Sequence, residues 1–192
     1  MSLDERAGKG SHADTILYEI DMLRQGFSTH PEKRKRVDAG GSLAARGEYY
    51  LSIEGFLLHA RNLLAFFTNR KNEMTDLIIN EPEVWYGKAV DPREYSGLIK
   101  AMKEVDTDFG EDGKKCYDQI SKFLMHCTTM RYERTKQWDL EGMFKRIDPI
   151  LEEFKTRFTP STKVTVYRGR ANASTATMNV VQTILDPSKG KS

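Results

Sequence analysis

The stretch Tyr49–Phe67, YYLSIEGFLLHARNLLAFF, carries the clearest structural pattern in the sequence. Its apolar side chains recur at intervals of three and four residues, on one helical face, over about five turns. These side chains are Tyr49, Ile53, Phe56, Leu57, Ala60, Leu63, Leu64 and Phe67. Because such a stripe is stable in water only when it packs against other helices, it predicts a core helix over Leu43–Arg70.

A second long helix is predicted over Gly113–Arg134, where apolar residues again share one face. They are Cys116, Tyr117, Ile120, Phe123, Leu124 and Cys127. A shorter helix is expected after Asp91-Pro92, because aspartate caps a helix and proline is tolerated in its first turn. Helical spacing predicts two more helices, one from Ala13 to Phe27 and one near Asp139–Phe158.

Residues that break helices indicate where these segments end. Gly26 and the sequence Thr29-His30-Pro31 predict the end of the first helix, which leaves Glu32–Gly41 as a solvated connector. Two glycines in Asp106–Gly113 predict a loop there. The chain around Trp85 is expected to be a loop with aromatic anchors and short irregular helix.

Together these patterns predict an all-α fold, an antiparallel helical bundle of about five helices. We expect one bundle domain over residues 13–160, since domains typically span ~50–250 residues. The polar, glycine-bearing residues 1–12 predict a disordered N-terminus. Residues 161–192 are rich in Ser, Thr, Asn, Gly and Lys, which predicts an irregular or weakly ordered tail.

The composition of the chain gives no indication of a nucleic-acid-binding, membrane-spanning or secreted protein. The chain has 30 Lys and Arg against 28 Asp and Glu, so its net charge of +2 does not indicate the strongly basic face of a nucleic-acid-binding protein. No run approaches the ~18 apolar residues of a membrane span. Met1–Gly10 lacks the apolar region of a secretory signal. Cys116 and Cys127 would lie about 16 Å apart on one helix, too far for a disulfide. We therefore expect a cytoplasmic protein that does not contact membranes.

Polar residues on the two core helices are the candidates for chemistry. On a helical wheel, His59 falls inside the apolar sector, while Glu54 and Arg61 share its flank. Arg131 and His126 fall on or near the apolar face of the second long helix. Charged groups directed at a core are costly unless they are paired, so these five residues predict a polar cluster between the helices. The cluster either fixes the register of the helices or forms a functional site.

Two segments resemble motifs of poorly characterised microbial helical proteins. They are Ile53–Leu64, IEGFLLHARNLL, and Ile120–Thr128, ISKFLMHCT; the family motifs read approximately ESFLLHARNL and INKxLAHLT. The second motif in turn resembles the RNxxxH signature of HEPN proteins, all-helical domains that often dimerise. Active HEPN members cut RNA without a metal, using an arginine and a histidine from both subunits.

By this resemblance, His126 matches the histidine of the HEPN signature, whereas Ser121 occupies the position of its arginine. A serine cannot stabilise the charge of a phosphorane. The leading hypothesis is therefore a HEPN-like binding or scaffold protein rather than an enzyme, present as a homodimer and, by family analogy, part of a toxin–antitoxin or phage-defence system. Its partner would be a protein or RNA.

Two alternatives remain open. One is a metal-independent ribonuclease with a rearranged site formed by His126 and Arg131. The other is a small-ligand binder in the cleft between the helices over Leu43–Arg70 and Gly113–Arg134. No segment has the spacing of a zinc site, a di-iron site or a glycine-rich phosphate loop, so we expect no metal and no cofactor.

Overall fold

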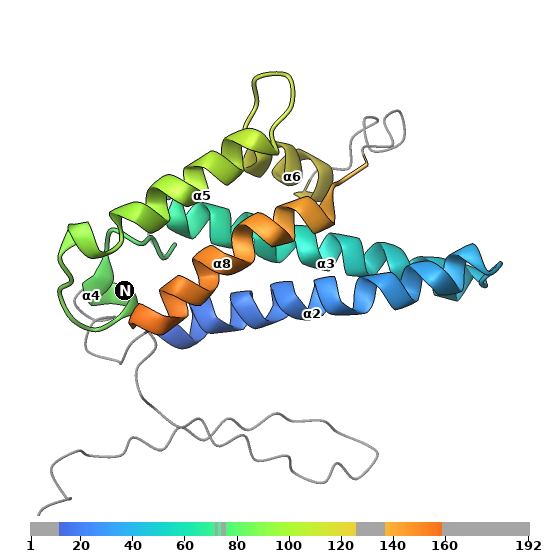
Figure 1. The fold of residues 1–192 in the computed structure, drawn as a ribbon, viewed down its shortest axis with the longest axis horizontal. Helices are drawn as coiled ribbons and strands as arrows, with labels where there is room; N and C mark the ends of the chain where they lie inside the picture. The colour runs from blue at the N-terminus through green and yellow to red at the C-terminus, as the bar shows by residue number, and fades with distance from the viewer. Residues whose placement is uncertain (1–11, 72, 74–75, 126–136, 159–192) are drawn as a thin grey trace, which may run out of the picture. The chain divides into compact units, whose positions relative to one another are not determined.

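The structure, a computed structural model, describes residues 12–71, 73, 76–125 and 137–158 of the 192-residue chain. The chain divides into two compact units, Met1–Arg157 and Phe158–Ser192, and the helices described below belong to the first, apart from the last residue of α8. Within the described residues all regular structure is helical (Figure 1), which confirms the predicted all-α fold. The N-terminus predicted to be disordered, apart from His12, and the tail predicted to be irregular or weakly ordered lie outside the described residues.

The longest helices, α2 (Ala13–Asp38) and α3 (Leu43–Phe67), lie side by side and antiparallel (Figure 1). A tight turn joins them. Ser42 caps α3, because its Oγ accepts a hydrogen bond from the Ala45 N–H at 3.3 Å. A Cβ on Gly41 would lie 2.5 Å from the Arg36 carbonyl oxygen, so the turn requires glycine. The predicted helix over Leu43–Arg70 is confirmed to within its last turn.

The predicted end of the first helix at Pro31 is wrong, because α2 continues to Asp38. Contacts with other helices on both sides of the proline explain the difference. Before it, the ring of Phe27 stacks on that of Phe144 with centroids 4.0 Å apart. Beyond it, Arg36 Nη1 lies 2.7 Å from Glu48 Oε2 on α3. Tertiary packing therefore outweighs the local cost of a proline in the helix.

The predicted C-terminal helix is α8 (Leu140–Phe158), which packs on both α2 and α3. Arg24 of α2 forms ion pairs with Asp148 and Glu152 of α8. Phe154 of α8 packs its ring against Phe66, Phe67 and Trp85, with centroids 5.3–5.8 Å apart. Trp85 belongs to the short helix α4 (Pro82–Trp85), so the expectation of aromatic anchors and irregular helix in this segment is confirmed.

The remaining elements are a 3₁₀ turn, η1 (Pro92–Glu94), and two helices, α5 (Ser96–Asp108) and α6 (Cys116–Met125). Asp91 caps η1, its carboxylate accepting a hydrogen bond from the Arg93 N–H. The helix predicted after Asp91-Pro92 is thus present, but it begins with a tighter turn. The loop predicted from Asp106 starts after Asp108 instead, because Asp106 is buried within α5. Both α5 and α6 pack on α3.

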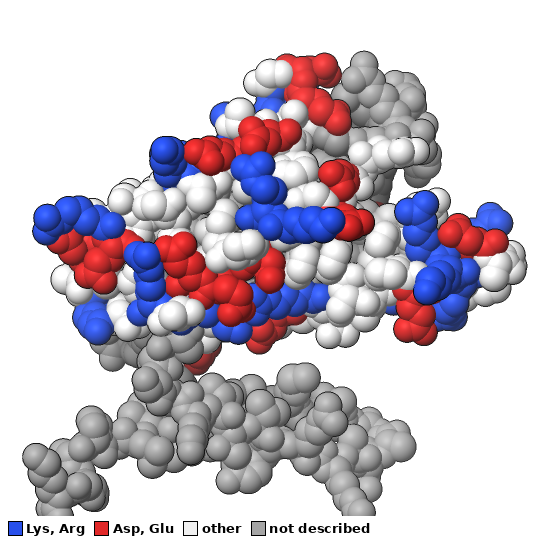
Figure 2. All heavy atoms as spheres, viewed as in Figure 1, with Lys and Arg blue, Asp and Glu red and all other residues white. Residues whose placement is uncertain are grey.

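The surface mixes both signs of charge. Figure 2 shows Lys and Arg interleaved with Asp and Glu over the visible face, and Lys and Arg gather most densely at the end where α2 meets α3. The basic run Lys33–Arg36 lies in the last turns of α2. Among the described residues, none of the helices combines the length and apolar character that a membrane crossing requires.

Candidate functional site

A cavity of about 520 Å³ opens between α2, α3 and α6. Polar groups line it from all three helices: Glu19 of α2, Arg61 and Asn62 of α3, and Tyr117 of α6, with Arg70 just beyond the end of α3. Ile16, Leu63, Phe66 and Leu77 supply apolar surface. Thr15, Glu73 and Asp76 add polar surface, so the lining is more polar than that of most small-molecule sites, although the volume lies within their range.

His59 forms the buried end of the polar network beside this cavity. It is 7% exposed, and its Nδ1 lies 2.8 Å from Glu19 Oε2, across the α2–α3 contact. Asn62 donates to the same carboxylate oxygen at 3.0 Å. The prediction that His59 is buried and hydrogen-bonded is confirmed. Its partner Glu19 was not predicted, although Glu19 borders the apolar stripe of α2, between Ile16 and Leu23.

Arg61 is half-buried and its hydrogen-bond partners are all uncharged. Its Nε donates to Ser121 Oγ at 2.7 Å, and its two terminal nitrogens donate to Tyr117 Oη at 3.1 Å and Asn62 Oδ1 at 3.3 Å. The guanidinium carbon also lies 4.9 Å from the centre of the Tyr117 ring. No carboxylate in the described part of the chain forms an ion pair with Arg61. In the described residues the guanidinium is therefore held by neutral groups, with no carboxylate at ion-pair distance.

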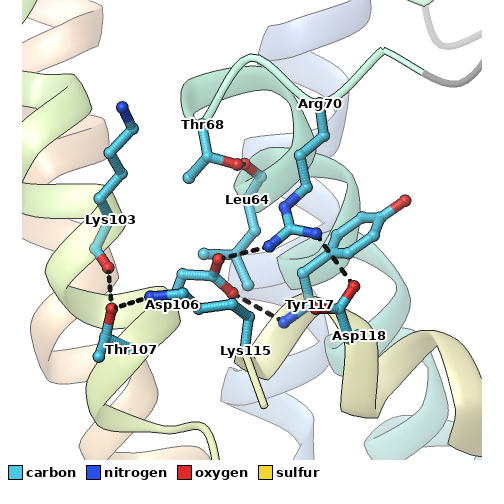
Figure 3. Close-up of polar contacts among 9 residues, drawn as sticks. All are labelled: Leu64, Thr68, Arg70, Lys103, Asp106, Thr107, Lys115, Tyr117 and Asp118. Carbon is cyan, nitrogen blue, oxygen red and sulfur yellow. Dashed lines mark hydrogen bonds and ion pairs between the residues drawn. The ribbon is translucent and has the colours of Figure 1, made fainter. Parts of the chain in front are cut away.

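Arg70 has the opposite environment, as Figure 3 shows. Its guanidinium lies 3.0 Å from Asp106 Oδ2 and 3.0 Å from Asp118 Oδ1, and its carbon lies 4.4 Å from the centre of the Tyr117 ring. Asp106 is 3% exposed, and its other oxygen accepts the Tyr117 N–H at 2.8 Å in the first turn of α6. Arg70 thus joins α3, α5 and α6, and two carboxylates balance its charge.

The predicted cluster of Glu54, His59, Arg61, His126 and Arg131 is only partly assembled among the described residues. His59 and Arg61 belong to one network, linked through Glu19 and Asn62. Arg61 bonds to Ser121, Tyr117 and Asn62 rather than to Glu54. Glu54 shares its flank of α3 but lies about two turns, or ~10 Å, away along the helix axis. His126 and Arg131 lie outside the described residues.

Sequence reasoning missed three residues that organise this site: Tyr117, Asp106 and Arg70. Tyr117 was assigned to the apolar face of its helix, and only its hydroxyl hinted at a polar role. Asp106 was placed in a loop, where a carboxylate is ordinarily solvated. Arg70 was identified only as the end of a helix. Each acquires its partner from an element distant in the sequence, so the local pattern held no signal for the pairing.

Comparison with known proteins gives no relative from which a role could be transferred. No family model, curated protein or solved structure matches the chain. The chemistry of the cleft therefore has to be argued from its own residues.

The arrangement can bind an anion. A guanidinium partly withdrawn from water and held by neutral acceptors gains most from a negatively charged ligand, because charge-assisted hydrogen bonds are the stronger ones. Ser121 Oγ contacts this cation, which cannot take its proton, so Ser121 is not arranged as an activated nucleophile. Among the described residues, no group of three or more His, Cys, Asp or Glu side chains could hold a metal ion.

Proposed function

We propose that the chain is a binding protein whose cleft between α2, α3 and α6 takes a small organic anion. The observation that carries this proposal is the environment of Arg61, a half-buried arginine with neutral partners that faces a cavity of about 520 Å³. Arg70, in the same cleft, already pairs with two carboxylates and serves the fold. Arg61 is therefore the group that would meet the anion.

The rest of the lining narrows the ligand class. Ile16, Leu63, Phe66 and Leu77 suit a ligand with an apolar body. Glu19 and Asn62 next to Arg61 suit a hydroxyl or amino group on that body, since a carboxylate and an amide oxygen accept hydrogen bonds. The acidic residues Glu19, Glu73 and Asp76 in the lining disfavour a second negative charge. The ligand is a monoanionic carboxylate with a hydrogen-bond donor, because a phosphate monoester carries about −1.5 to −2 charge at pH 7.

The test is a screen of α-amino acids and α-hydroxy acids, read by ligand-observed NMR and thermal unfolding. At least one class should bind wild type and raise its melting temperature. Arg61→Gln keeps hydrogen-bonding capacity but removes the charge, and should weaken binding by about tenfold or more. Arg34→Gln, an exposed arginine near the end of α2, is the matched control and should bind as wild type does. Binding unaffected by Arg61→Gln, or none at all, contradicts the proposal.

A second candidate, a metal-independent ribonuclease, has one contact in its favour. Arg61 Nε donates to Ser121 Oγ, so a guanidinium lies against the residue that occupies the arginine position of the HEPN-like pattern, five residues before His126. In such a ribonuclease Arg61, rather than Arg131, would stabilise the negative charge that develops on the phosphate. We expect no RNA cleavage above background in the presence of a chelator. Robust cleavage that His126→Ala abolishes without unfolding the protein would favour the ribonuclease over the binding protein.

The HEPN-like resemblance extends the proposal to the cellular role. We propose a non-catalytic binding or scaffold function for a cytoplasmic homodimer in a toxin–antitoxin or phage-defence system, with a protein or RNA partner. The support is the pair of sequence motifs, Ile53–Leu64 and Ile120–Thr128. A neighbouring gene for a nucleotidyltransferase-like antitoxin is the expected genomic context, and consistent absence of such a neighbour counts against this extension.

A further inference from the structure

One face of α3 is apolar and open to solvent. Leu43, Tyr50, Leu51 and Leu58 are 86%, 60%, 67% and 38% exposed. At ~100° per residue, they fall in one sector of about 100° together with Gly47 and Glu54. The only other exposed large hydrophobic residue in the described part of the chain is Tyr18 of α2. A contiguous exposed apolar face of this kind marks an interaction surface.

The exposed side chains of this face have the same spacing whether they are read from the N-terminal or from the C-terminal end of α3. Leu43 precedes Tyr50 by seven residues, and Leu51 precedes Leu58 by seven. Reversal about the midpoint between Tyr50 and Leu51 exchanges Leu43 with Leu58 and Gly47 with Glu54. The whole set therefore maps onto itself. In an antiparallel pair of α3 helices with a two-fold axis at this midpoint, each position faces the one with which it is exchanged, so the exposed set of one copy meets the same set of the other.

We propose that two copies of the chain associate through this face, with their α3 helices antiparallel and Tyr50 of each beside the partner's Leu51. The inference rests on the homodimer of the proposed function and specifies its surface. In this register Leu43 meets the partner's Leu58 at both ends of the contact. The four exposed side chains of each copy are then covered by the same four side chains of the other, which removes apolar surface from water.

The shape of the helix agrees with the antiparallel register. A Cβ added to Gly47 would have no atom within 4 Å, so the helix surface is open there. The partner's Glu54 faces that position. The self-complementary spacing of the exposed side chains favours a second copy over an unrelated apolar partner, because each of them then meets a member of the same set.

Light scattering and sedimentation equilibrium at micromolar concentrations test the surface. Wild type should have twice the chain mass of 22.0 kDa. Leu51→Arg places two like charges at the centre of the contact and should weaken dimerisation by about tenfold or more. Tyr18→Arg, a charge at the exposed hydrophobic residue of α2, is the matched control and should leave the mass unchanged. Circular dichroism should show both variants folded.

Two failures have different meanings. A monomer at every concentration overturns the homodimer and this surface together. A stable dimer that Leu51→Arg does not weaken overturns only the surface, and leaves the proposed homodimer standing.

Disulfide trapping tests the register. Leu43→Cys combined with Leu58→Cys in one chain should form a covalent dimer on oxidation. The two positions lie about 22 Å apart within one helix, so they cannot bridge within a chain. Leu43→Cys alone should remain uncrosslinked, and wild type under the same conditions controls for the native cysteines. Equally efficient crosslinking of the single variant overturns the antiparallel arrangement.

Discussion

Arg61 and Arg70 lie nine residues apart and line the same cleft, yet their partners differ in kind. Arg70 contacts two carboxylates, one of them almost fully buried. Arg61 contacts a serine hydroxyl, a tyrosine hydroxyl and an amide oxygen. Burying a charge costs free energy unless that charge is compensated. At Arg70 the fold itself supplies the compensation, whereas at Arg61 the described residues supply only neutral hydrogen-bond acceptors.

The two carboxylates on Arg70 should differ in their contribution to stability. Asp106→Asn removes the charge from a 3% exposed side chain that also accepts the Tyr117 N–H, and should lower the free energy of unfolding by about 2–3 kcal/mol. Asp118→Asn acts on the same guanidinium from a half-exposed position and should cost less than about 1 kcal/mol. Urea denaturation of both variants gives the comparison. Equal losses would mean that burial does not set the strength of this pair.

His30 should make stability depend on pH. Burial against α3 lowers the pKa of its imidazole below the usual value of about 6.5, and the nearby Arg34 and Lys33 lower this pKa further. The unfolded chain therefore binds a proton at higher pH than the folded chain does. The free energy of unfolding should fall as the pH drops below about 6.5, until folded His30 is protonated too.

His30→Gln should flatten that part of the curve. The measurement is urea denaturation of wild type and variant at pH 7.5, 6.5 and 5.5, with the difference between the two proteins plotted against pH. The variant should gain stability relative to wild type as the pH falls. A difference that stays constant across this range contradicts the assignment to His30.

Sequence could identify some single residues of the site but not their partners. His59 was predicted to be buried because it lies within the apolar stripe of its own helix, a local property. Its acceptor Glu19 lies 40 positions away in the sequence, and Arg61 and Tyr117 are 56 apart. Such pairs depend on how helices are placed against each other, which the periodicity of one helix does not encode.

Among the elements, helix centres were predictable and helix ends less so. Apolar periodicity located α3, α5, α6 and α8, because each buries one stripe against its neighbours. The end of α2 was predicted wrongly at Pro31. Proline indicates a break only when no other interaction holds the chain helical, and here ring stacking between His30 and Tyr49 helps to keep α2 against α3. By continuing past Pro31, α2 lengthens its antiparallel contact with α3, although the proline destabilises the helix locally.

That cost can be measured by replacing the proline. Pro31 has no N–H to donate to the carbonyl of Phe27, so Pro31→Ala restores a helical hydrogen bond. The variant should be more stable by about 1–2 kcal/mol, less than the full ~3 kcal/mol of an interior proline because alanine also frees the unfolded chain. Thermal and urea unfolding give the values.

Pro92→Ala is the matched control for this substitution. Pro92 opens the 3₁₀ turn η1, where the missing N–H costs nothing and the fixed φ favours the turn. This variant should be neutral or slightly less stable than wild type. If Pro31→Ala behaved in the same way, α2 would carry no proline penalty and the packing argument for its extension would fail.

At the scale of the whole described bundle, two regions of α3 have separate tasks. Its C-terminal half contacts α2, α6 and α8 and carries both the polar cleft and the aromatic core. Its N-terminal half pairs with α2 and leaves one apolar face exposed. Phe66 connects the cleft to the core, since it lines the cavity and also packs on Phe154 and Trp85. A ligand in the cleft should therefore stabilise the bundle against unfolding.

Phe154 is the residue on which the packing of α8 depends most. It is 3% exposed and contacts three aromatic rings from α3 and α4. Phe154→Ala should lower the free energy of unfolding by about 3–5 kcal/mol, because the cavity it leaves is walled by large rings that cannot collapse into it.

Phe144→Ala is the matched control. It removes the same side chain from a half-buried position on the same helix, where it stacks on Phe27, and should lower the free energy of unfolding by about 1–2 kcal/mol. Urea denaturation followed by tryptophan fluorescence reports both, since Trp85 lies in the affected core. A loss at Phe154 no larger than that at Phe144 would show that α8 is held instead by its ion pairs with Arg24.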